Sequence, residues 1–297
     1  MDYSAAEVEE LLGKAARLKS GAWKPSLAGK TLAMLFQKNS TRTRASFEAG
    51  MTRLGGHAMF MDFKNTQLGR GETIHDTIKC LERYCDAIMA RLNKHDDLEE
   101  MARHASVPVI NGLTDLYHPC QTLADILTVA EKKGGVKAIN GLKLVFLGDC
   151  GFNMFNSTAI GFSKLGCAVT ACCPNKADYL PNPKVMALAR KQAKAPVVTE
   201  HDVAKAVQGA DVLVTDTWVS MGQENEEQRV ADLRPFQLNA AVLAKAKKDA
   251  IVLHCLPAHR GQEITGDVID GPHSVVFDEA ENRLHAQNAV LATLLKA

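Results

Sequence analysis

Short apolar runs alternate with amphipathic stretches along most of the chain. Thr31–Phe36 and Ala87–Ala90 have the length and apolar character of buried strands, whereas Ala5–Lys19 and Pro119–Lys133 repeat their apolar residues at helical spacing. In the second half, the runs predicted to be strands are Leu142–Leu147, Ala168–Cys172, Val197–Thr199, Val212–Thr215, Ile251–His254 and Val275–Phe277. Strands that alternate with helices indicate an α/β fold in which mostly parallel sheets are flanked by helices.

The long helical pattern that begins at Pro119 ends at two adjacent glycines, Gly134 and Gly135. A chain of 297 residues is longer than a single hydrophobic core usually supports, so we expect two domains. Because glycines end helices and mark loops, we place the domain boundary at this point. The predicted architecture is two α/β domains joined by long helices, with residues 1–133 in the first, residues 134–280 in the second, and a final helix at residues 281–297.

The charges of the chain are balanced, since 35 Lys and Arg residues stand against 34 Asp and Glu residues, a formal net charge of +1. Such a balance argues against nucleic acid or an anionic membrane as a partner of the whole surface. Residues 1–20 carry Glu7, Glu9 and Glu10 where a signal peptide has a basic segment and an apolar core. No run approaches the roughly 18 apolar residues of a membrane span. We therefore expect a cytoplasmic protein.

Eight cysteines are spread along the chain, mostly within apolar patterns, and none forms a Cys-x-x-Cys pair. This spacing favours neither disulfides nor a zinc site, so most of these thiols are interpreted as small buried side chains. Cys255 differs because it follows the strand Ile251–His254 and precedes Pro257, which cannot continue a sheet ladder. Its thiol could be a nucleophile, a hydrogen-bond partner or inert.

The five residues Ser40-Thr41-Arg42-Thr43-Arg44 stand between an apolar run and a helical pattern, which is typical of a strand, a tight turn and a helix start. Two guanidiniums and three hydroxyls would then lie beside the unpaired amides and the positive dipole end of a helix. Together these groups suit a phosphate dianion. The alternative is an ordinary N-cap followed by two solvated arginines.

Further polar residues follow predicted strands, where ligands of open parallel sheets bind. Arg91 comes directly after Ala87–Ala90, and His118 and Gln121 flank Pro119 at a helix start. Taken singly, each has an ordinary alternative as a surface or capping residue. The polar segment Gln67–Thr73 reads equally well as a plain loop or as a mobile flap.

The second half carries three further candidates. Gly148–Asn153 follows a strand but lacks the Gly-x-Gly-x-x-Gly spacing of a dinucleotide site, so we expect no dinucleotide there. With no metal-binding cysteine spacing either, we expect no cofactor and no metal. Asp216–Glu224 supplies a carboxylate, a hydroxyl and a glycine, which suit an ammonium ligand or, alternatively, a turn that caps the next helix. Arg283 lies near the start of the final helix. Its side chain either reaches back to the other candidate residues at the strand ends or lies on the helix surface.

Four motifs in this order carry a resemblance to a known family: Ser40–Arg44, His118–Gln121, Asp216 with Ser220–Gly222, and His254–Pro257. From about Leu32 to the final helix, the chain resembles the ornithine carbamoyltransferases. The resemblance implies a carbamoyl phosphate domain followed by an ornithine domain, with the helix at 281–297 returning to the first. It also implies a homotrimer or a multiple of trimers.

Matched position by position, the resemblance implies three groups of site residues. The residues implied to bind carbamoyl phosphate are Ser40, Thr41, Arg42, Thr43, Arg44, Gln67 from a neighbouring subunit, Arg91, His118, Gln121, Cys255, Leu256 and Arg283. Those implied to bind ornithine are Asn153, Asp216, Ser220 and Met221. Those implied in the chemistry are Cys255, Asp216, Arg91 and His118.

The implied reaction transfers the carbamoyl group of carbamoyl phosphate to the side-chain amine of L-ornithine, giving L-citrulline and phosphate in arginine biosynthesis. Positioned donors such as Thr43, Arg91 and His118 would stabilise the oxyanion of the tetrahedral intermediate. The amine proton would pass to Cys255, to Asp216 or to the departing phosphate.

One position departs from the family pattern, because Phe152 stands where the family commonly has the first of two adjacent asparagines. A phenyl ring cannot donate to a carboxylate, which bears on the choice of acceptor. Two alternatives therefore stand beside ornithine transfer. One is a carbamoyltransferase for another amine, putrescine or an acylated ornithine, and the other is a catalytically silent anion-binding homologue.

Overall fold

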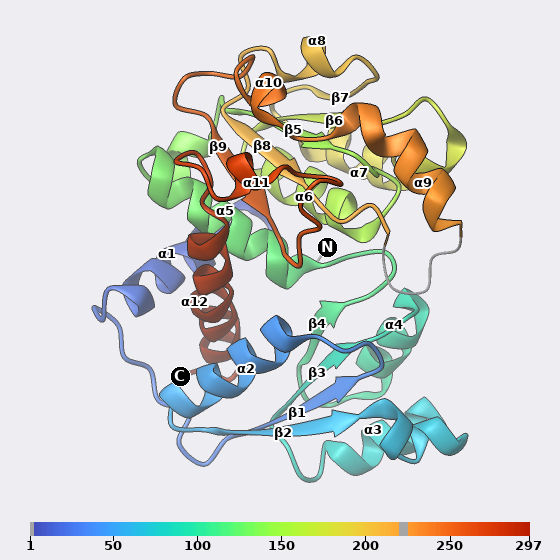
Figure 1. The fold of residues 1–297 in the computed structure, drawn as a ribbon. Helices are drawn as coiled ribbons and strands as arrows, with labels where there is room; N and C mark the ends of the chain where they lie inside the picture. The colour runs from blue at the N-terminus through green and yellow to red at the C-terminus, as the bar shows by residue number, and fades with distance from the viewer. Residues whose placement is uncertain (1–2, 220–224) are drawn as a thin grey trace. The chain divides into compact units, whose positions relative to one another are not determined.

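The computed structural model describes residues 3–219 and 225–297, and the chain divides into two compact units (Figure 1). The first unit comprises Met1–Ala124 and Glu281–Ala297, and the second comprises Asp125–Ala280. Two helices contain residues of both units, α5 (Pro119–Lys133) and α12 (Val276–Leu294). The chain therefore passes from the first unit to the second within α5 and returns within α12.

The first unit contains a four-stranded parallel sheet in the order β2-β1-β3-β4. Its strands are β1 (Thr31–Phe36), β2 (His57–Asp62), β3 (Ala87–Arg91) and β4 (Val109–Leu113). Its other helices are α1 (Ala5–Lys19), α2 (Thr41–Arg53), α3 (Ile74–Leu81) and α4 (His95–His104). Ile78 of α3 and Met101 of α4 pack against Leu35 and Ile88 of the sheet. Strands covered in this way are apolar throughout, which explains their continuous hydrophobic runs.

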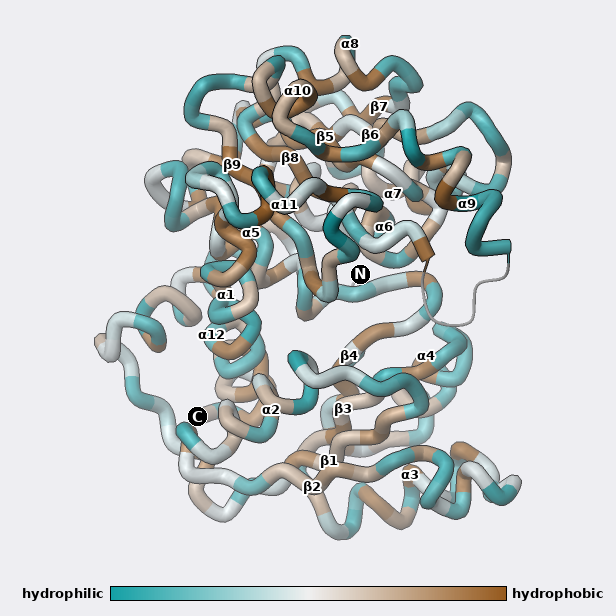
Figure 2. The backbone as a smooth tube through the Cα atoms, in the orientation of Figure 1, coloured by the Kyte–Doolittle hydropathy of each residue, from teal (hydrophilic) through white to brown (hydrophobic). Residues whose placement is uncertain are grey.

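The second unit contains a five-stranded parallel sheet in the order β7-β6-β5-β8-β9. Its strands are β5 (Lys143–Leu147), β6 (Ala168–Cys172), β7 (Val197–Glu200), β8 (Val212–Thr215) and β9 (Ile251–His254). Its helices include α6 (Asn153–Lys164), α7 (Pro183–Gln192), α8 (Val203–Val207), α9 (Glu226–Leu233), α10 (Ala240–Leu243) and α11 (Gly266–Ile269). In both units the strands are largely brown, or hydrophobic, in Figure 2. The predicted α/β class with parallel sheets is confirmed.

Core packing in the second unit uses both faces of its sheet. Leu213 of β8 and Val252 of β9 cluster with Val207 of α8 and Val268 of α11. Phe146 and Phe155, which belong to β5 and α6, pack edge to face with their ring centroids 5.6 Å apart. The short 3-10 helices of the two units are η1 (Phe63–Asn65), η2 (Leu68–Arg70), η3 (Val136–Ile139), η4 (Ala177–Tyr179) and η5 (Arg234–Phe236). Of the helices in the described ranges, none has both the length and the apolar character that crossing a bilayer requires.

The strand predicted at Val275–Phe277 is wrong, because α12 begins at Val276. Ser274, the residue before this segment, forms an isolated parallel bridge with Val252. The β-branched and aromatic residues favour a strand locally. However, Asp278 and Glu279 supply the acidic first turn that favours a helix start. Helix α9 was not among the predicted elements.

Candidate active site

The candidate residues gather where the strand order reverses in each sheet. In the first sheet the reversal lies between β1 and β3, whose carboxyl ends lead to Ser40 and to Arg91. In the second it lies between β5 and β8, which lead to Asn153 and to Asp216. Ligands of open parallel sheets bind at such points, because the two connections leave in opposite directions and open a crevice. Each unit therefore presents its own group of candidate residues.

Ser40 starts helix α2 as its N-cap residue, with extended backbone and its hydroxyl accepting a hydrogen bond from the Thr43 amide at 3.2 Å. The cap uses one of the four amides that a helix start leaves unpaired. Thr43 is completely buried, and Arg42 is half-buried. A helix N-terminus with these side chains is suited to an anion.

Arg283 of α12 connects three of the predicted site residues in the first unit. Its Nη1 donates to Gln121 Oε1 at 2.7 Å and its Nη2 donates to Thr43 Oγ1 at 3.0 Å. All three side chains are at most 2 % exposed. The structure thus brings Thr43, Gln121 and Arg283 together as a buried hydrogen-bonded group.

His118 lies within the positive field of the same unit. Burial lowers the pKa of this imidazole well below 6.5, and the charges of Arg283, Arg91 and Arg42 lower it further. His118 is therefore neutral at physiological pH and can donate one ring N–H without carrying a charge. The charges of three predicted residues, Arg42, Arg91 and Arg283, thus all act on this one imidazole.

Lys38, which the sequence reasoning did not single out, also lies near this group. Burial lowers its pKa, the charge of Arg91 lowers it further, and Asp115 opposes the shift. The signal available in the sequence was its place in the loop that directly follows β1.

Two residues predicted to bind carbamoyl phosphate, Arg44 and Gln67, make contacts outside the group around Arg283. The Arg44 guanidinium donates to Glu48 at 3.0 Å and stacks on Phe60, 3.7 Å from the ring centroid. Gln67 is exposed, and its backbone carbonyl accepts from the amides of Arg70 and Glu72 in its own loop. Neither side chain is brought into the group around Arg283.

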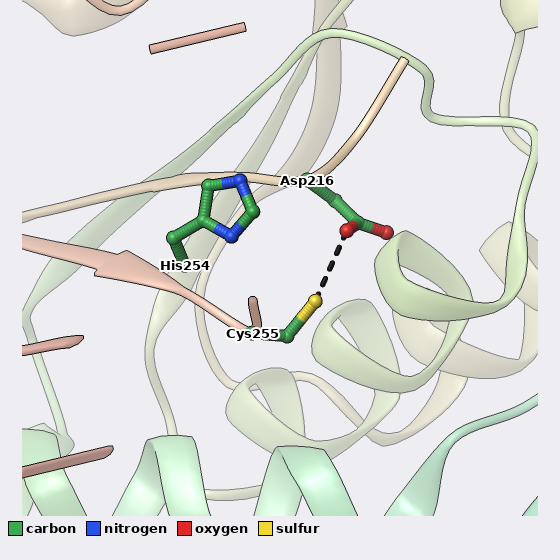
Figure 3. Close-up of side chains that lie close together, drawn as sticks. All are labelled: Asp216, His254 and Cys255. Atoms are coloured by element: carbon green, nitrogen blue, oxygen red, sulfur yellow. Dashed lines mark hydrogen bonds between the residues drawn. The ribbon is translucent and has the colours of Figure 1, made fainter. Parts of the chain in front are cut away.

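In the second unit, Asp216 and Cys255 form a direct side-chain pair (Figure 3). Cys255 Sγ donates to Asp216 Oδ1 at 3.0 Å, and the Thr217 amide donates to the same oxygen at 2.8 Å. Asp216 follows β8 and Cys255 follows β9, which are neighbours in the sheet. Parallel pairing thus places the two side chains, 39 positions apart, at the same edge.

The surroundings decide which partner holds the proton. Part of the Asp216 side chain reaches solvent, but the protein crowded around it raises the pKa of the carboxyl by burial. Burial also raises the pKa of the Cys255 thiol well above 9.0, and the negative charge of Asp216 adds to this shift. Cys255 is therefore a thiol donor and not a thiolate nucleophile.

His254 stands beside this pair but is bound by other groups. The Leu256 amide donates to Nδ1 at 2.9 Å, so Nδ1 carries no proton and Nε2 donates to Glu263 Oε1 at 3.1 Å. The donor atoms of Asp216, His254 and Cys255 lie within 4.8 Å of one another, close enough for a metal ion. Because both His254 nitrogens have protein partners and Cys255 keeps its proton, this arrangement suits proton transfer better than metal binding.

Leu256 directly follows Cys255 in the chain, and Asn153 lies in the segment after β5, the neighbour of β8 in the sheet. Leu256 has a φ of +57°, a left-handed conformation that costs about 1–2 kcal/mol for an L-residue, and the hydrogen bond from its amide to His254 Nδ1 helps to hold it. Asn153 is the buried first residue of α6, whose N-cap Phe152 makes no side-chain capping bond. The predicted ornithine residues Ser220 and Met221 lie outside the described residues.

An ion pair that was not predicted from the sequence supports the loops around Asp216. Arg229 of α9 pairs with the half-buried Asp149 and donates through Nε to the Trp218 carbonyl at 3.1 Å. These bonds tie together the loops that follow β5 and β8. The signal available was the strand-end position of Asp149.

Comparison with known proteins supports the same division. Residues 1–131 match the carbamoyl-P binding domain of the aspartate/ornithine carbamoyltransferases, and residues 140–294 match their Asp/Orn binding domain. A protein of Carboxydothermus hydrogenoformans named ornithine carbamoyltransferase is 51% identical, over 99% of this chain and 95% of its own length. A protein of Pyrococcus furiosus named anabolic ornithine carbamoyltransferase is 51% identical, over 99% of this chain and 94% of its own.

Solved structures agree with these matches. An ornithine carbamoyltransferase structure from Pyrococcus furiosus superposes with a TM-score of 0.92 at 52% identity, covering 98% of this chain and 94% of that chain. Another, from Thermus thermophilus, superposes with a TM-score of 0.89 at 41% identity, covering 99% of this chain and 96% of that chain. With family matches over both units and relatives above half identity over nearly its whole length, the chain belongs to the aspartate/ornithine carbamoyltransferase family.

Proposed function

We propose that this protein is an ornithine carbamoyltransferase that transfers the carbamoyl group of carbamoyl phosphate to the side-chain amine of L-ornithine, forming L-citrulline and phosphate. The observation that carries the proposal is the full-length similarity, together with a group of fitting side chains in each unit. The first unit holds the arginine-rich helix start, and the second holds the Asp216–Cys255 pair. The relative named anabolic supports the biosynthetic direction.

Carbamoyl phosphate binds in the first unit under this proposal. Ser40 to Thr43 and the start of α2 hold the phosphate, while Arg91, His118 and Gln121 hold the carbamoyl group. Arg44 would take part only by leaving its contacts with Glu48 and Phe60. The exposed Gln67 supports a role toward the site of a neighbouring subunit, as a trimer or a multiple of trimers would require.

The chemistry follows from the donors that the two units present. The neutral side-chain amine attacks the carbonyl carbon, so a C–N bond forms and the oxygen gains negative charge. Thr43, Arg91 and neutral His118 stabilise that oxyanion, and one lost donor of this kind costs about 10²–10³ in turnover. The C–O bond to phosphate then breaks. No covalent enzyme intermediate is needed, which agrees with a protonated Cys255.

Asp216 is the group that accepts the amine proton in this scheme. Its raised pKa makes it a stronger base than an ordinary aspartate, and its Oδ1 is held by Cys255 and Thr217. Cys255 positions the carboxylate by donating its S–H. Asn153, Ser220 and Met221 are assigned to the amino-acid end of ornithine, and Leu256 to the region around the carbamoyl group.

A colorimetric assay for ureido products tests the proposal. The purified protein is given carbamoyl phosphate with L-ornithine, putrescine or N-acetyl-L-ornithine, and products are identified by mass spectrometry. We expect citrulline from L-ornithine, with kcat/KM at least about tenfold higher than for either other amine. Preference for another amine would assign a different acceptor, and no product from any amine would favour the silent homologue.

A further inference from the structure

Gln287 of α12 makes two side-chain hydrogen bonds that reach the candidate phosphate site. The residue is fully buried and lies one helical turn after Arg283. Its Oε1 accepts from Arg283 Nε at 3.0 Å, and its Nε2 donates to Ser46 Oγ at 2.8 Å. None of the motifs discussed above includes Gln287 or Ser46.

The partners of the Gln287 side chain fix the orientation of its amide. Arg283 Nε is solely a donor, so the oxygen of the Gln287 amide must face it and the nitrogen must face Ser46. Ser46 Oγ donates its own hydrogen to the Arg42 carbonyl at 2.6 Å or to the Thr43 carbonyl at 3.2 Å, and either bond leaves a lone pair to accept from Gln287. A side chain at position 287 must therefore accept on one side and donate on the other. A carboxylate or an apolar group cannot do both.

Both arms of this network end on the first turn of α2. Through Arg283 the first arm reaches Thr43, whose Oγ1 accepts from Nη2 and so has its own hydrogen left to point elsewhere. Through Ser46 the second arm reaches the carbonyl of Arg42. Gln287 thereby holds a guanidinium, a hydroxyl and a helix turn in one arrangement, and the Thr43 hydroxyl is set as a donor, as an anion requires.

We propose that Gln287 is a positioning residue for phosphate recognition, acting through Arg283 and Ser46 without touching the ligand. The inference rests on the proposed function, in which the first turn of α2 receives the phosphate of carbamoyl phosphate. The Gln287 amide hydrogen-bonds to both Arg283 and Ser46. Its loss therefore removes one hydrogen bond that holds the guanidinium and one that holds Ser46 beside the first turn of α2.

The test compares four variants of the full-length protein by titration calorimetry with inorganic phosphate and by steady-state kinetics. Gln287→Leu removes both bonds at similar size, and Gln287→Glu keeps the bond to Arg283 but not the donor. Ser46→Ala removes only the second arm. The matched control is Leu291→Ala, which truncates a fully buried apolar side chain on the same helix.

We expect Gln287→Leu to weaken phosphate binding by about tenfold and to raise KM for carbamoyl phosphate similarly, with KM for ornithine within about twofold of wild type. Ser46→Ala and Gln287→Glu should each weaken phosphate binding by a smaller factor. Leu291→Ala should lower the melting temperature while phosphate affinity stays unchanged. If Gln287→Leu does not fold, the two milder variants decide the question.

Wild-type phosphate affinity in Gln287→Leu, or in both milder variants, would overturn the proposal and leave Gln287 a purely structural residue. Equal loss of affinity in Leu291→Ala would overturn it as well, because any loosening of α12 would then suffice. Failure of the proposed function looks different, since the wild type would then form no citrulline whatever the phosphate affinities of the variants.

Discussion

Replacing Asp216 by asparagine separates the charge of this side chain from its hydrogen-bonding geometry. In the present structure, Asp216 Oδ1 accepts from Cys255 Sγ at 3.0 Å and from the Thr217 amide at 2.8 Å. The side-chain oxygen of an asparagine can still accept both hydrogen bonds. The variant therefore keeps the two bonds that orient the side chain. It loses only the capacity to take a proton from the attacking amine.

The expected loss of turnover follows from that single change. Removal of a positioned general base typically lowers the rate by about 10²–10⁴-fold, so we expect kcat to fall within that range. The effect on KM for ornithine should be smaller, because the amide preserves the shape of the site. The thiol at Cys255 should also become more acidic, since one of the causes of its raised pKa is the charge of Asp216.

Although its turnover should fall, the Asp216→Asn variant should be more stable than the wild type. Burial raises the folded-state pKa of Asp216 above its unfolded value near 3.8, so the ionised carboxylate destabilises the fold at neutral pH. The substituted amide carries no charge in either the folded or the unfolded state. We therefore expect Asp216→Asn to raise the free energy of unfolding at pH 7, with the advantage shrinking as the pH falls toward 3.8.

The two effects are measured together on the same preparation. Citrulline formation under saturating substrates gives kcat, and denaturant unfolding between pH 7 and pH 5 gives stability. Wild-type turnover in Asp216→Asn would remove the carboxylate from proton transfer. A less stable variant at pH 7 would show that the charge is stabilised by its surroundings, contrary to the direction of the pKa shift.

Three further predictions concern residues on both units. Cys255→Ala should lower kcat by about tenfold while changing the dissociation constant for ornithine less, because the thiol orients Asp216 and does not bind the amino acid; equal kcat would exclude that role. Arg42→Ala should weaken phosphate binding in calorimetry by about 10–100-fold, whereas Arg44→Ala should have a smaller effect because Arg44 is engaged by Glu48 and Phe60; equal losses would contradict this difference. His118→Gln should lose less stability than the wild type as the pH falls below about 6.5, because the unfolded histidine takes up a proton there and the folded one, with its lowered pKa, does not. Melting temperatures of the two proteins that fall in parallel from pH 7.5 to 5.5 would contradict this prediction.

Much of the fold could be predicted because the signals are local. Helix Ala5–Lys19 has the predicted limits, and its start carries a reciprocal capping box between Ser4 and Glu7. Strand Thr31–Phe36 also has the predicted limits, since it is a continuous apolar run buried in a parallel sheet. The failure at Val275–Phe277 shows the limit of such signals, because α12 begins within a run that favours a strand.

The candidate site, like the fold, could be predicted from the sequence only in part. Strand ends identified Arg91, Asp216 and Cys255 as candidates, because parallel pairing brings successive strand ends to one edge. The sequence contains nothing that pairs Arg283 with Thr43, which is 240 positions away, or Gln287 with Ser46. It also gave no indication that Arg44 would turn toward Phe60.

The amino-acid sequence by itself determined where most helices and strands form, and which residue types stand at the strand ends, because both depend largely on interactions among residues a few positions apart. Only the tertiary structure decided that Cys255 keeps its proton, that His118 stays neutral, and that Arg283 is held by Gln287. Those properties depend on burial and on charges brought together from distant parts of the chain.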